Sequence, residues 1–433
     1  MSQRTLPRSR QHVVIVGGGF GGQAVAEHLS HVPVAVTLVD KHDYHTFQPL
    51  LYQVATALLN SEDVGHPLRA AFRHQKNVTF REATVTEIDW RTNRVLLDEG
   101  EPLPFDYLVL AAGATVNYFG VSGAQQYAIP LYTLPDAVRL RDRILERFES
   151  ADRDPSLLAD GALTFVVVGG GPTGVETAGA LTDMFQHVLA KDYPHLAVNK
   201  ARVALVERER AVIPPYTERL RDYAAHTLQA QGVELLLGES LSAVQPTRAR
   251  LSSGVEVPAH TVIWAGGLHA NPLADTTGFA QGAGGRIVVG SDLSVKQHPN
   301  VFVVGDLAQI SDDGHVLPQL ARPAIEAGAH VAKQITRRLM GQPGQPFHYN
   351  NPGTMATIGR GAAVCEFPNG VTLDGPVAWL AWLGVHLVEL GGMRNRLDVL
   401  TSWGWGLLTN ERAARISIEP VSDPRSASTQ PTS

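Results

Sequence analysis

Short apolar runs alternate with glycine-rich turns and amphipathic segments in the first part of the chain. The first run, His12–Val16, is rich in β-branched residues and predicts a buried parallel strand. A helix is predicted from Gln23 to about Ser30, and a second strand over Val34–Val39 ends at Asp40. This order of strand, helix and strand predicts a βαβ unit with an acidic residue at the end of its second strand.

The turn between the first strand and its helix carries the pattern G-x-G-x-x-G at Gly17, Gly19 and Gly22. This pattern is typical of a dinucleotide site. The first glycine permits the tight turn, the second lets the backbone approach a pyrophosphate, and the third lets the helix pack on the strand. The N-terminus of the helix offers N–H groups to phosphates, and Asp40 can accept hydrogen bonds from a ribose diol.

The same arrangement recurs later in the chain. The apolar run Leu163–Val168 is followed by the glycine-rich residues 169–174 and a helix, and the strand Val203–Val206 ends at Glu207. The distance from glycines to acid is longer in this copy. An insertion at about Met184–Lys200 accounts for it and predicts a longer connecting helix or an added loop. Two copies, each between a strand and a helix, predict two nucleotide sites.

Three further apolar runs support this interpretation. Tyr107–Gly113 and Thr261–Gly267 are matching strands that end in small residues, and each is predicted to close one βαβ unit. Val301–Asp306 is another buried strand that ends in Gly305 and Asp306. An acid at that position can bond a polyhydroxy chain, while the glycine allows close approach.

Composition excludes several functional classes. The chain has 433 residues with a net charge of −6, which disfavours a dedicated nucleic-acid binder. Its single cysteine, Cys365, excludes an internal disulfide, a zinc site built on thiolates and a redox-active dithiol. No apolar run reaches the ~18 residues needed to span a bilayer, and no secretory signal is apparent, so the cytoplasm is the expected compartment.

The paired loops and the late Gly-Asp resemble the flavoproteins with two dinucleotide-binding domains. Four segments are similar to the type II NADH dehydrogenases, the NADH:quinone oxidoreductases that pump no protons: Phe47–Thr56, Gly169–Glu176, Asn351–Arg360 and His386–Arg396. The resemblance covers most of the chain. It implies an α/β fold with two Rossmann-like dinucleotide-binding domains, one for FAD and one for NADH.

The resemblance also implies the cofactor contacts. Non-covalent FAD is expected at Gly17, Gly19, Phe20, Gly22, Asp40, Lys41, Gln48, Gln53, Ala112, Gly113, Gly305, Asp306, Leu320 and Ala321. NADH is expected at Gly169, Gly171, Pro172, Thr173, Gly174, Glu207 and Gly266. A carboxylate at Glu207 favours NADH because it repels the 2′-phosphate of NADPH, although Arg208 and Arg210 follow it and either can turn toward a phosphate.

In the family the acid that matches Glu176 is linked to quinone reduction, as a proton relay or a positioning group. A carboxyl group beside an apolar ring can have a raised pKa and pass protons. The alternative is that Glu176 only complements the dipole of its helix.

The chain departs from the family at its acceptor motif. Where the family carries Ala-Gln-x-Ala-x-Gln, this chain has Ala321–Glu326, with Arg322 and Glu326 in place of the two glutamines. Arginine only donates hydrogen bonds and ionised glutamate only accepts them. Arg322 can bond a quinone oxygen or pair with Glu326 one turn further on. Pro323 requires the first turn of a helix that starts near Gln319, and that helix start is expected to face the flavin.

The C-terminal region is predicted to associate with a membrane. Trp379, Trp382, Leu383, His386 and Leu390 recur at helical spacing, and tryptophan favours the membrane interface. Arg394, Arg396, Arg412 and Arg415 are expected to meet lipid headgroups. The alternative is a helix packed on the protein body or at a dimer interface. The predicted domains are 1–128 with 280–346 for FAD, 129–279 for NADH, and 347–433 for the membrane region, with a disordered tail from about 421.

The sequence therefore predicts an FAD-dependent NADH:quinone oxidoreductase with Glu176, Gln319, Arg322 and Glu326 at the quinone. A peripheral location on the cytoplasmic side of the inner membrane is expected, with a homodimer implied by the resemblance, and with no metal and no nucleic acid. Two alternatives remain: a soluble NAD(P)H-dependent reductase of a small electron-transfer protein, and a redox sensor that binds flavin without turnover.

Overall fold

The computed structural model describes residues 10–412 and 414–416. These residues form two compact units. Unit 1 comprises residues 10–46, Gly65–Asn117 and Gly267–Asn351, and unit 2 comprises Phe47–Val64, Tyr118–Gly266 and the described residues from 352 onward. This division into units does not test the predicted domain boundaries, which stay predictions. The predicted disordered tail from about residue 421 lies outside the described residues.

Unit 1 is built on a six-stranded sheet. Its order is β21 (Ser294–Val295), β22 (His298–Val303), β9 (Tyr107–Leu110), β1 (His12–Val16), β2 (Ala35–Asp40) and β5 (Val78–Glu82). All neighbours pair in parallel except β21 and β22. The β-branched residues of β1 are fully or almost fully buried, which explains why this strand reads as a continuous apolar run. The predicted strand His12–Val16 is confirmed, and the next strand includes Asp40 as its last residue.

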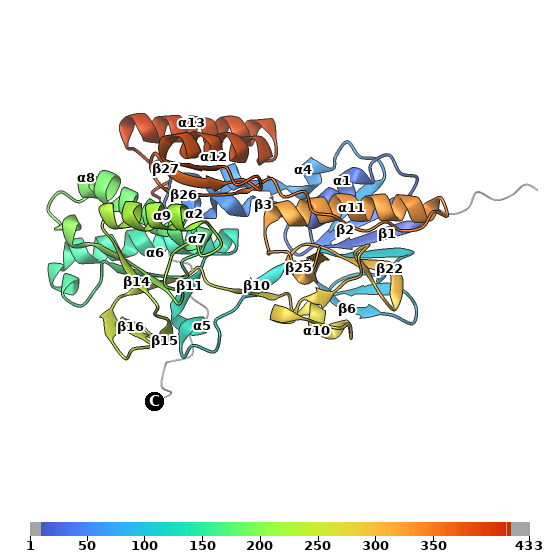
Figure 1. The fold of residues 1–433 in the computed structure, drawn as a ribbon, viewed down its shortest axis with the longest axis horizontal. Helices are drawn as coiled ribbons and strands as arrows, with labels where there is room; N and C mark the ends of the chain where they lie inside the picture. Colours follow the sequence, from blue (N-terminus) through green and yellow to red (C-terminus); the bar gives the residue numbers. More distant parts are fainter. Residues whose placement is uncertain (1–9, 413, 417–433) are drawn as a thin grey trace, which may run out of the picture. The chain divides into compact units, whose positions relative to one another are not determined.

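Two helices pack together on this sheet, α1 (Phe20–His28) and α11 (Ala321–Leu339) (Figure 1). They approach closely because a Cβ atom on Gly328 would lie 2.3 Å from the carbonyl oxygen of Gly21. The first helix begins three residues earlier than predicted, because the end of the glycine loop forms its first turn. Helix α11 begins two residues after Gln319, and Pro323 lies in its first turn as required.

Unit 1 is completed by short elements around the sheet. These are β3 (Tyr44–Thr46), β4 (Gly65–Pro67), α4 (Leu68–Ala71), β6 (Val85–Asp89), β7 (Arg94–Leu97), β8 (Leu103–Pro104), β10 (Ala114–Val116), β19 (Leu268–Ala270), α10 (Leu273–Thr276), β20 (Ile287–Val288), β23 (Ala308–Gln309), β24 (Ser311–Asp312) and β25 (His315–Val316).

Unit 2 contains a second parallel sheet. Its order is β11 (Ala128–Pro130), β18 (Thr261–Trp264), β12 (Thr164–Val168), β13 (Arg202–Glu207) and β14 (Val233–Leu237). The helices α6 (Leu134–Arg153) and α9 (Glu218–Ala230) belong to this part of the unit. Helix α6 begins with a capping box, in which Thr133 and Asp136 satisfy each other's backbone N–H groups. The three strands predicted around the second glycine loop are confirmed as β12, β13 and β18.

Helix α7 (Pro172–Met184) follows the second glycine loop and packs on β26 (Thr354–Gly359). The contact is close, because a Cβ atom on Gly179 would lie 1.9 Å from the carbonyl oxygen of Ile358. The predicted lengthening of this connection is confirmed: α7 continues into a π-helical turn, Phe185–Leu189, and then α8 (Ala190–Asp192).

The C-terminal part of unit 2 combines a small antiparallel sheet with two helices. Strands β26, β27 (Ala362–Glu366) and β28 (Thr372–Asp374) form the sheet, and α12 (Gly375–Glu389) packs on it beside α13 (Met393–Thr409) (Figure 1). Among the described residues, no helix is both long and apolar enough to cross a membrane. The shorter elements of unit 2 are α2 (Leu51–Ala55), α3 (Ser61–Val64), α5 (Ala124–Tyr127), β15 (Leu241–Gln245), β16 (Arg248–Leu251) and β17 (Glu256–Pro258).

The prediction that Trp382, His386 and Leu390 face a membrane is wrong. These side chains are at most 9% exposed, because this stripe of α12 packs inward. Helix α12 is apolar on most of its circumference, so the spacing of its bulky residues did not reveal which face is exposed.

Gly22→Ala should destabilise unit 1, because the added Cβ atom would lie 1.9 Å from the carbonyl oxygen of Gly17. Overpacking of this kind typically costs about 1–3 kcal/mol. Gly19→Ala is a matched control in the same loop, since a Cβ atom there meets nothing within 4 Å. Thermal unfolding followed by circular dichroism should give a lower Tm for Gly22→Ala than for Gly19→Ala. Equal values would contradict the close packing of this loop.

Candidate functional site

The first glycine loop, in unit 1, is held by the acid at the end of β2. Gly17 has a φ of +107°, and a Cβ atom there would lie 2.2 Å from the carbonyl oxygen of Ala111, so only glycine fits. The N–H of Gly18 donates to Asp40 Oδ2 at 2.6 Å, and the N–H of His42 donates to Asp40 Oδ1 at 2.8 Å. Each carboxylate oxygen keeps a further acceptor site. The loop thus leaves open space at Gly19, beside a helix N-terminus and an acid.

The second loop, in unit 2, repeats this arrangement. The N–H of Gly170 donates to Glu207 Oε2 at 2.5 Å, and the N–H of Glu209 donates to Glu207 Oε1 at 2.8 Å. Gly171 is as open as Gly19 in the first loop. Arg208 is largely exposed and lies 3.4 Å from the carboxylate of Glu209. The middle glycines, Gly18 and Gly170, were not among the predicted site residues, although three consecutive glycines in both copies were a usable signal.

The N-terminus of α11 gathers several predicted residues of unit 1. Gln319 Nε2 donates to the backbone carbonyl of Asp306 at 3.0 Å, and Leu320 is the N-cap residue. Gly305, with a φ of +68°, would place a Cβ atom 3.6 Å from that of Ala324 in the first turn of the helix. The structure therefore brings the Gly-Asp segment and the start of α11 together.

The residues that replace the family glutamines form an ion pair. Arg322 Nε lies 3.1 Å from Glu326 Oε1, and Glu326 Oε2 accepts the N–H of Asn350 at 3.0 Å. Of the two alternatives considered for Arg322, the pairing one turn further on is the one the structure contains. Glu326 also fastens the segment before Asn351 to this helix.

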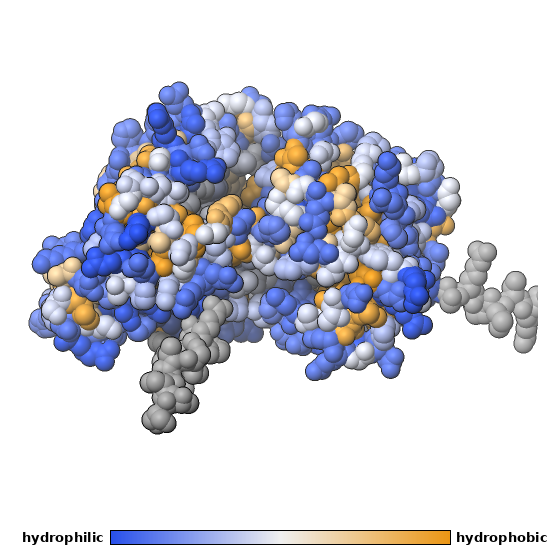
Figure 2. Space-filling model, turned by 90° about the horizontal axis from the view of Figure 1, so that it is seen from below, coloured by the Kyte–Doolittle hydropathy of each residue, from blue (hydrophilic) through white to orange (hydrophobic). Residues whose placement is uncertain are grey.

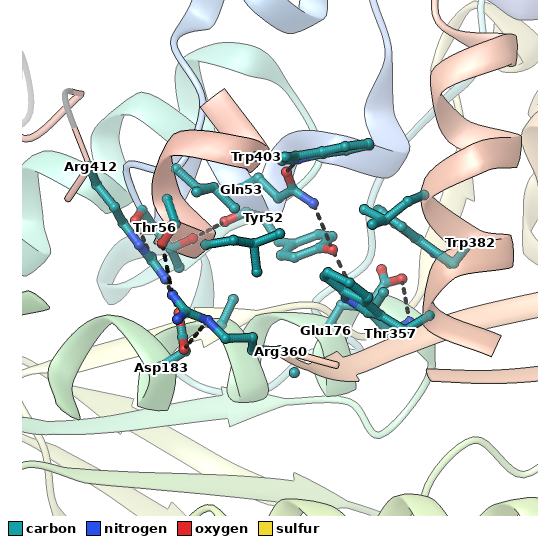
Figure 3. Close-up of a pocket in the computed structure, with 17 residues that line it drawn as sticks. Tyr52, Gln53, Thr56, Glu176, Asp183, Thr357, Arg360, Trp382, Trp403 and Arg412 are labelled. Carbon is teal, nitrogen blue, oxygen red and sulfur yellow. Dashed lines mark hydrogen bonds and ion pairs between the residues drawn. The ribbon is translucent and has the colours of Figure 1, made fainter. Parts of the chain in front are cut away.

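A pocket lies within unit 2, between α2, α7, β26 and the helices α12 and α13 (Figure 3). About 640 Å³ of space lies within it, a figure that includes open solvent. Aromatic and aliphatic side chains dominate one wall, and Trp382 stacks on His386 with 3.9 Å between ring centroids. The residues that line the pocket include Tyr52, Gln53, Thr56, Glu176, Asp183, Thr357, Arg360, Trp379, Trp382, Leu383, Trp403, Leu407 and Arg412.

Glu176 is the acid at one end of this pocket. Its Oε1 atom accepts the backbone N–H of Thr357 at 3.2 Å. Burial raises the pKa of Glu176 to about 8, although the bond from Thr357 and the indole of Trp382 oppose the rise. The carboxyl group is therefore largely protonated at pH 7. Glu176 lies beyond the first turn of α7, where the helix dipole has little effect, so dipole complementation does not explain its position.

Asp183 lies two turns along the same helix, at the other end of the pocket. Its carboxylate is paired with Arg412 and, at 3.4 Å, with Arg360 Nε (Figure 3). Arg412 also donates to the carbonyl oxygen of Thr56 at 2.6 Å, and its side chain is only 4% exposed. The prediction that Arg412 meets lipid headgroups is therefore wrong, because its guanidinium is buried and forms an ion pair with Asp183.

Comparison with known proteins places this geometry in a family. The model of the pyridine nucleotide-disulphide oxidoreductases matches residues 11–328. Two type II NADH:quinone oxidoreductases of Mycobacterium tuberculosis are 37% and 38% identical over 422 residues. The matches cover 94% and 93% of this chain and 90% and 88% of the relatives. The chain belongs to the type II NADH:quinone oxidoreductase family.

Solved structures agree on the fold. The NDH2 of Plasmodium falciparum in complex with NADH superimposes with a TM-score of 0.87 at 18% identity, covering 94% of this chain and all of that one. A sulfide:quinone oxidoreductase of Aquifex aeolicus gives a TM-score of 0.71 at 18% identity, covering 93% of this chain and 96% of that one. The mixed α/β architecture expected for a type II NADH:quinone oxidoreductase is thus confirmed.

FAD and NADH are the cofactors of this oxidoreductase family, and the chain's residues fit both. Each glycine loop leaves an open glycine where a pyrophosphate can approach, and each adjoins a carboxylate with spare acceptor sites. Which loop takes which cofactor stays a prediction.

The remaining predicted cofactor residues fall into two groups. Phe20 meets His45 edge to face at 4.7 Å, Lys41 is exposed, and Ala112 and Gly113 follow β9 beside Gly17, all in unit 1. In unit 2, Gln48 donates to the carbonyl of Tyr132, the carbonyl of Gly266 accepts the indole N–H of Trp264, and both amide atoms of Gln53 are hydrogen-bonded. Their contacts with cofactors stay predictions.

The expected absence of a metal also stays a prediction. Asp312, Asp313 and His348 of unit 1 bring three possible ligand atoms within 4.8 Å of one another. Two of the three residues are exposed, and exposed acids often lie this close together, so we assign no site.

Glu176→Gln should remove one source of pH dependence from the stability of unit 2. The folded pKa of Glu176 is about 8 against 4.5 for the free group, so the folded state holds a proton that the unfolded state has lost between these values. Stability should therefore fall as pH rises from about 4.5 to 8, and glutamine, which stays neutral, should reduce that fall. Thermal unfolding at pH 5 and pH 8 tests this, and an equal loss of Tm in both proteins would contradict it.

Proposed function

We propose that this chain oxidises NADH through FAD and reduces a quinone, and that the quinone ring enters the pocket of unit 2 at Glu176. Family membership supports the overall reaction. The observation that carries the assignment of the pocket is a buried carboxyl group, whose pKa burial raises to about 8, at the end of a cavity walled by tryptophan and leucine.

Proton balance gives Glu176 its role. NADH supplies a hydride, which amounts to one proton and two electrons, whereas a quinone needs two protons and two electrons to become a quinol. FAD bound to this chain would supply the chemistry of hydride acceptance and electron transfer. One further proton must reach a quinone oxygen in each turnover, and a carboxyl group with a pKa near 8 holds such a proton at neutral pH.

The pocket's other surfaces suit a quinone ring. Flat aromatic walls such as Trp382 and Trp403 can stack on it. The ion pairs of Asp183 with Arg360 and Arg412 make the other end of the pocket polar and hold these side chains in place. We keep Gln319, Arg322 and Glu326 of unit 1 as proposed acceptor residues. Arg322 and Glu326 are also proposed to stabilise the neighbouring backbone, because they pair with each other and Glu326 accepts the N–H of Asn350.

Glu207 is proposed to select NADH. Its carboxylate already holds the loop through Gly170 and would repel a 2′-phosphate while accepting the hydroxyl groups of a ribose.

Helices α12 and α13 are proposed to rest on a membrane surface. Large apolar side chains lie exposed on both: Val377, Leu380 and Val388 on α12, and Met393, Leu397, Leu400 and Leu408 on α13, each at least 51% exposed. Such a set on neighbouring helices exceeds the scattered exposure that is normal for a soluble surface. By contrast, the surface seen in Figure 2 is largely hydrophilic, with smaller apolar patches. A quinone dissolved in lipid would then meet the helices that wall the pocket. The cytoplasmic side and a homodimer are proposed from the family resemblance alone.

Glu176→Gln should slow quinone reduction at pH 7 by about 100-fold, the usual contribution of a positioned acid. NADH-dependent reduction of ferricyanide should persist, because that acceptor takes electrons without protons. Steady-state assays with a panel of soluble quinones measure both. Full quinone turnover by the variant would contradict the proposed role of Glu176. If the unaltered protein is reduced once by NADH and then shows no turnover, a redox sensor is favoured instead.

Replacing Leu380, Val388, Leu397 and Leu408 by serine should abolish flotation with anionic liposomes while leaving ferricyanide reduction intact. The matched control replaces two exposed apolar residues elsewhere, Val255 and Met340, which are 57% and 67% exposed. Unchanged flotation of the first variant would contradict the membrane proposal and favour the soluble reductase.

A further inference from the structure

We propose that Trp403 is a positioning residue for the acceptor pocket, which acts through Gln53 and Tyr52 to fix the hydrogen-bonding groups beside Glu176. This inference rests on the proposed function, because it assumes that Glu176 serves the quinone. It adds a role for a tryptophan that lies on α13, the helix proposed to face the membrane.

Buried hydrogen bonds connect Trp403 to the side chain of Thr357, whose backbone N–H in turn bonds Glu176 (Figure 3). Trp403 Nε1 donates to Gln53 Oε1 at 2.7 Å, and Gln53 Nε2 donates to the hydroxyl oxygen of Tyr52 at 3.0 Å. That hydroxyl lies 2.9 Å from Thr357 Oγ1, and the backbone N–H of Thr357 donates to Glu176. The chain crosses from α13 through α2 and β26 to α7.

The indole of Trp403 decides the direction of this chain. An indole N–H can only donate, so the amide of Gln53 must turn its oxygen toward Trp403 and its nitrogen toward Tyr52. The Tyr52 oxygen then accepts from Gln53, and its own O–H is left for Thr357. If Thr357 instead donated its hydroxyl hydrogen to Tyr52, the Tyr52 oxygen would accept two bonds and its own O–H would lack a protein acceptor among these groups, which costs free energy in a buried site.

Every donor hydrogen in this arrangement points along the chain in the direction of Glu176. The positive ends of these dipoles favour the carboxylate over the carboxylic acid. Without the indole N–H, the amide of Gln53 is free to rotate by half a turn and present its oxygen to Tyr52. The O–H of Tyr52 would then turn toward Gln53 and away from Thr357, so the dipoles between Gln53 and the hydroxyl of Thr357 would reverse, while the backbone N–H of Thr357 would keep its bond to Glu176.

Other charged or titratable groups also lie near Glu176. Tyr216 and Tyr52 are close enough to interact with its charge, and Asp183, Arg360 and Arg412 line the far end of the pocket. Arg412 and Arg360 are held by Asp183, and none of these three is a member of the chain. Loss of the indole N–H leaves their pairing unchanged. The ring of Trp403 also lies 6.1 Å from that of Trp382, and phenylalanine keeps an aromatic ring at that contact, so the effect of the lost N–H should reach Glu176 through Gln53 and Tyr52.

The test compares Trp403→Phe with Trp405→Phe, using a water-soluble quinone. Phenylalanine keeps an aromatic ring but loses the N–H. Trp405 is a matched control on the same helix, since it is 56% exposed and its N–H bonds Glu411 at 3.1 Å outside the pocket. Trp403→Phe should lower kcat for the quinone by about tenfold, the factor that corresponds to one neutral hydrogen bond. It should also move the alkaline limb of the pH profile upward, because the acid loses dipoles that favour ionisation.

Ferricyanide reduction and flavin retention should be unchanged in both variants, and Trp405→Phe should match the unaltered protein throughout. Since Trp403 acts through Tyr52, Trp403→Phe should have little further effect in a Tyr52→Phe background. If Trp403→Phe does not fold, Tyr52→Phe breaks the same chain at its third member and should move the alkaline limb of the quinone pH profile in the same direction.

Two results would overturn the proposal: a pH profile of Trp403→Phe that equals that of Trp405→Phe, or effects of Trp403→Phe and Tyr52→Phe that multiply independently. Failure of the proposed function looks different. In that case the unaltered protein reduces ferricyanide but none of the quinones, and the role of Trp403 falls with it.

Discussion

The bond between a carboxylate and a glycine N–H is the constraint on which both nucleotide loops depend. Asp40 makes it with Gly18 in unit 1, and Glu207 makes it with Gly170 in unit 2. In each loop this bond holds the end of the neighbouring strand against the middle glycine. A Cβ atom at Gly170 would lie 2.8 Å from the side chain of Glu207, and one at Gly18 would lie 2.6 Å from the side chain of Leu68. The open glycine beside it is then free to meet a phosphate. Both units thus fix the conformation of their glycine loop with the same kind of hydrogen bond.

Helix α7 connects this loop chemistry with the acceptor pocket. Its N-terminus closes the second glycine loop, its middle carries Glu176, and its C-terminal turn carries Asp183. The two acids are treated in opposite ways. Asp183 is paired with two arginines, whereas no cation of the described residues bonds Glu176, and burial raises the pKa of Glu176 to about 8. A buried charge needs such a partner, so the environment of Glu176 favours the protonated carboxyl group that the proposed proton transfer requires.

The sequence predicted the parts of the molecule that are local. The strands around each loop, the acids at their ends and the longer connection after α7 follow from apolar runs and glycine spacing. Glu176 was found because it stands in a recognisable motif. The partners of Glu176 were not, since Gln53 and Trp403 lie 350 residues apart and Tyr52 and Thr357 lie 305 apart. The prediction for Trp382 was wrong because a helix that is apolar on most of its circumference hides which residues turn inward. The prediction for Arg412 was wrong because its partner, Asp183, lies 229 residues away in the sequence.

The contact between Gly179 and Ile358 has a consequence for how such a protein can diverge. The helix and strand meet so closely that even a methyl group at position 179 would push them apart. Thr357 is the neighbour of Ile358, and its backbone N–H bonds Glu176. Any separation of the helix and strand would therefore also weaken this hydrogen bond. Among descendants of this chain, a larger residue at position 179 would therefore require a compensating change in the strand that faces it, although about two fifths of the polypeptide separates the two.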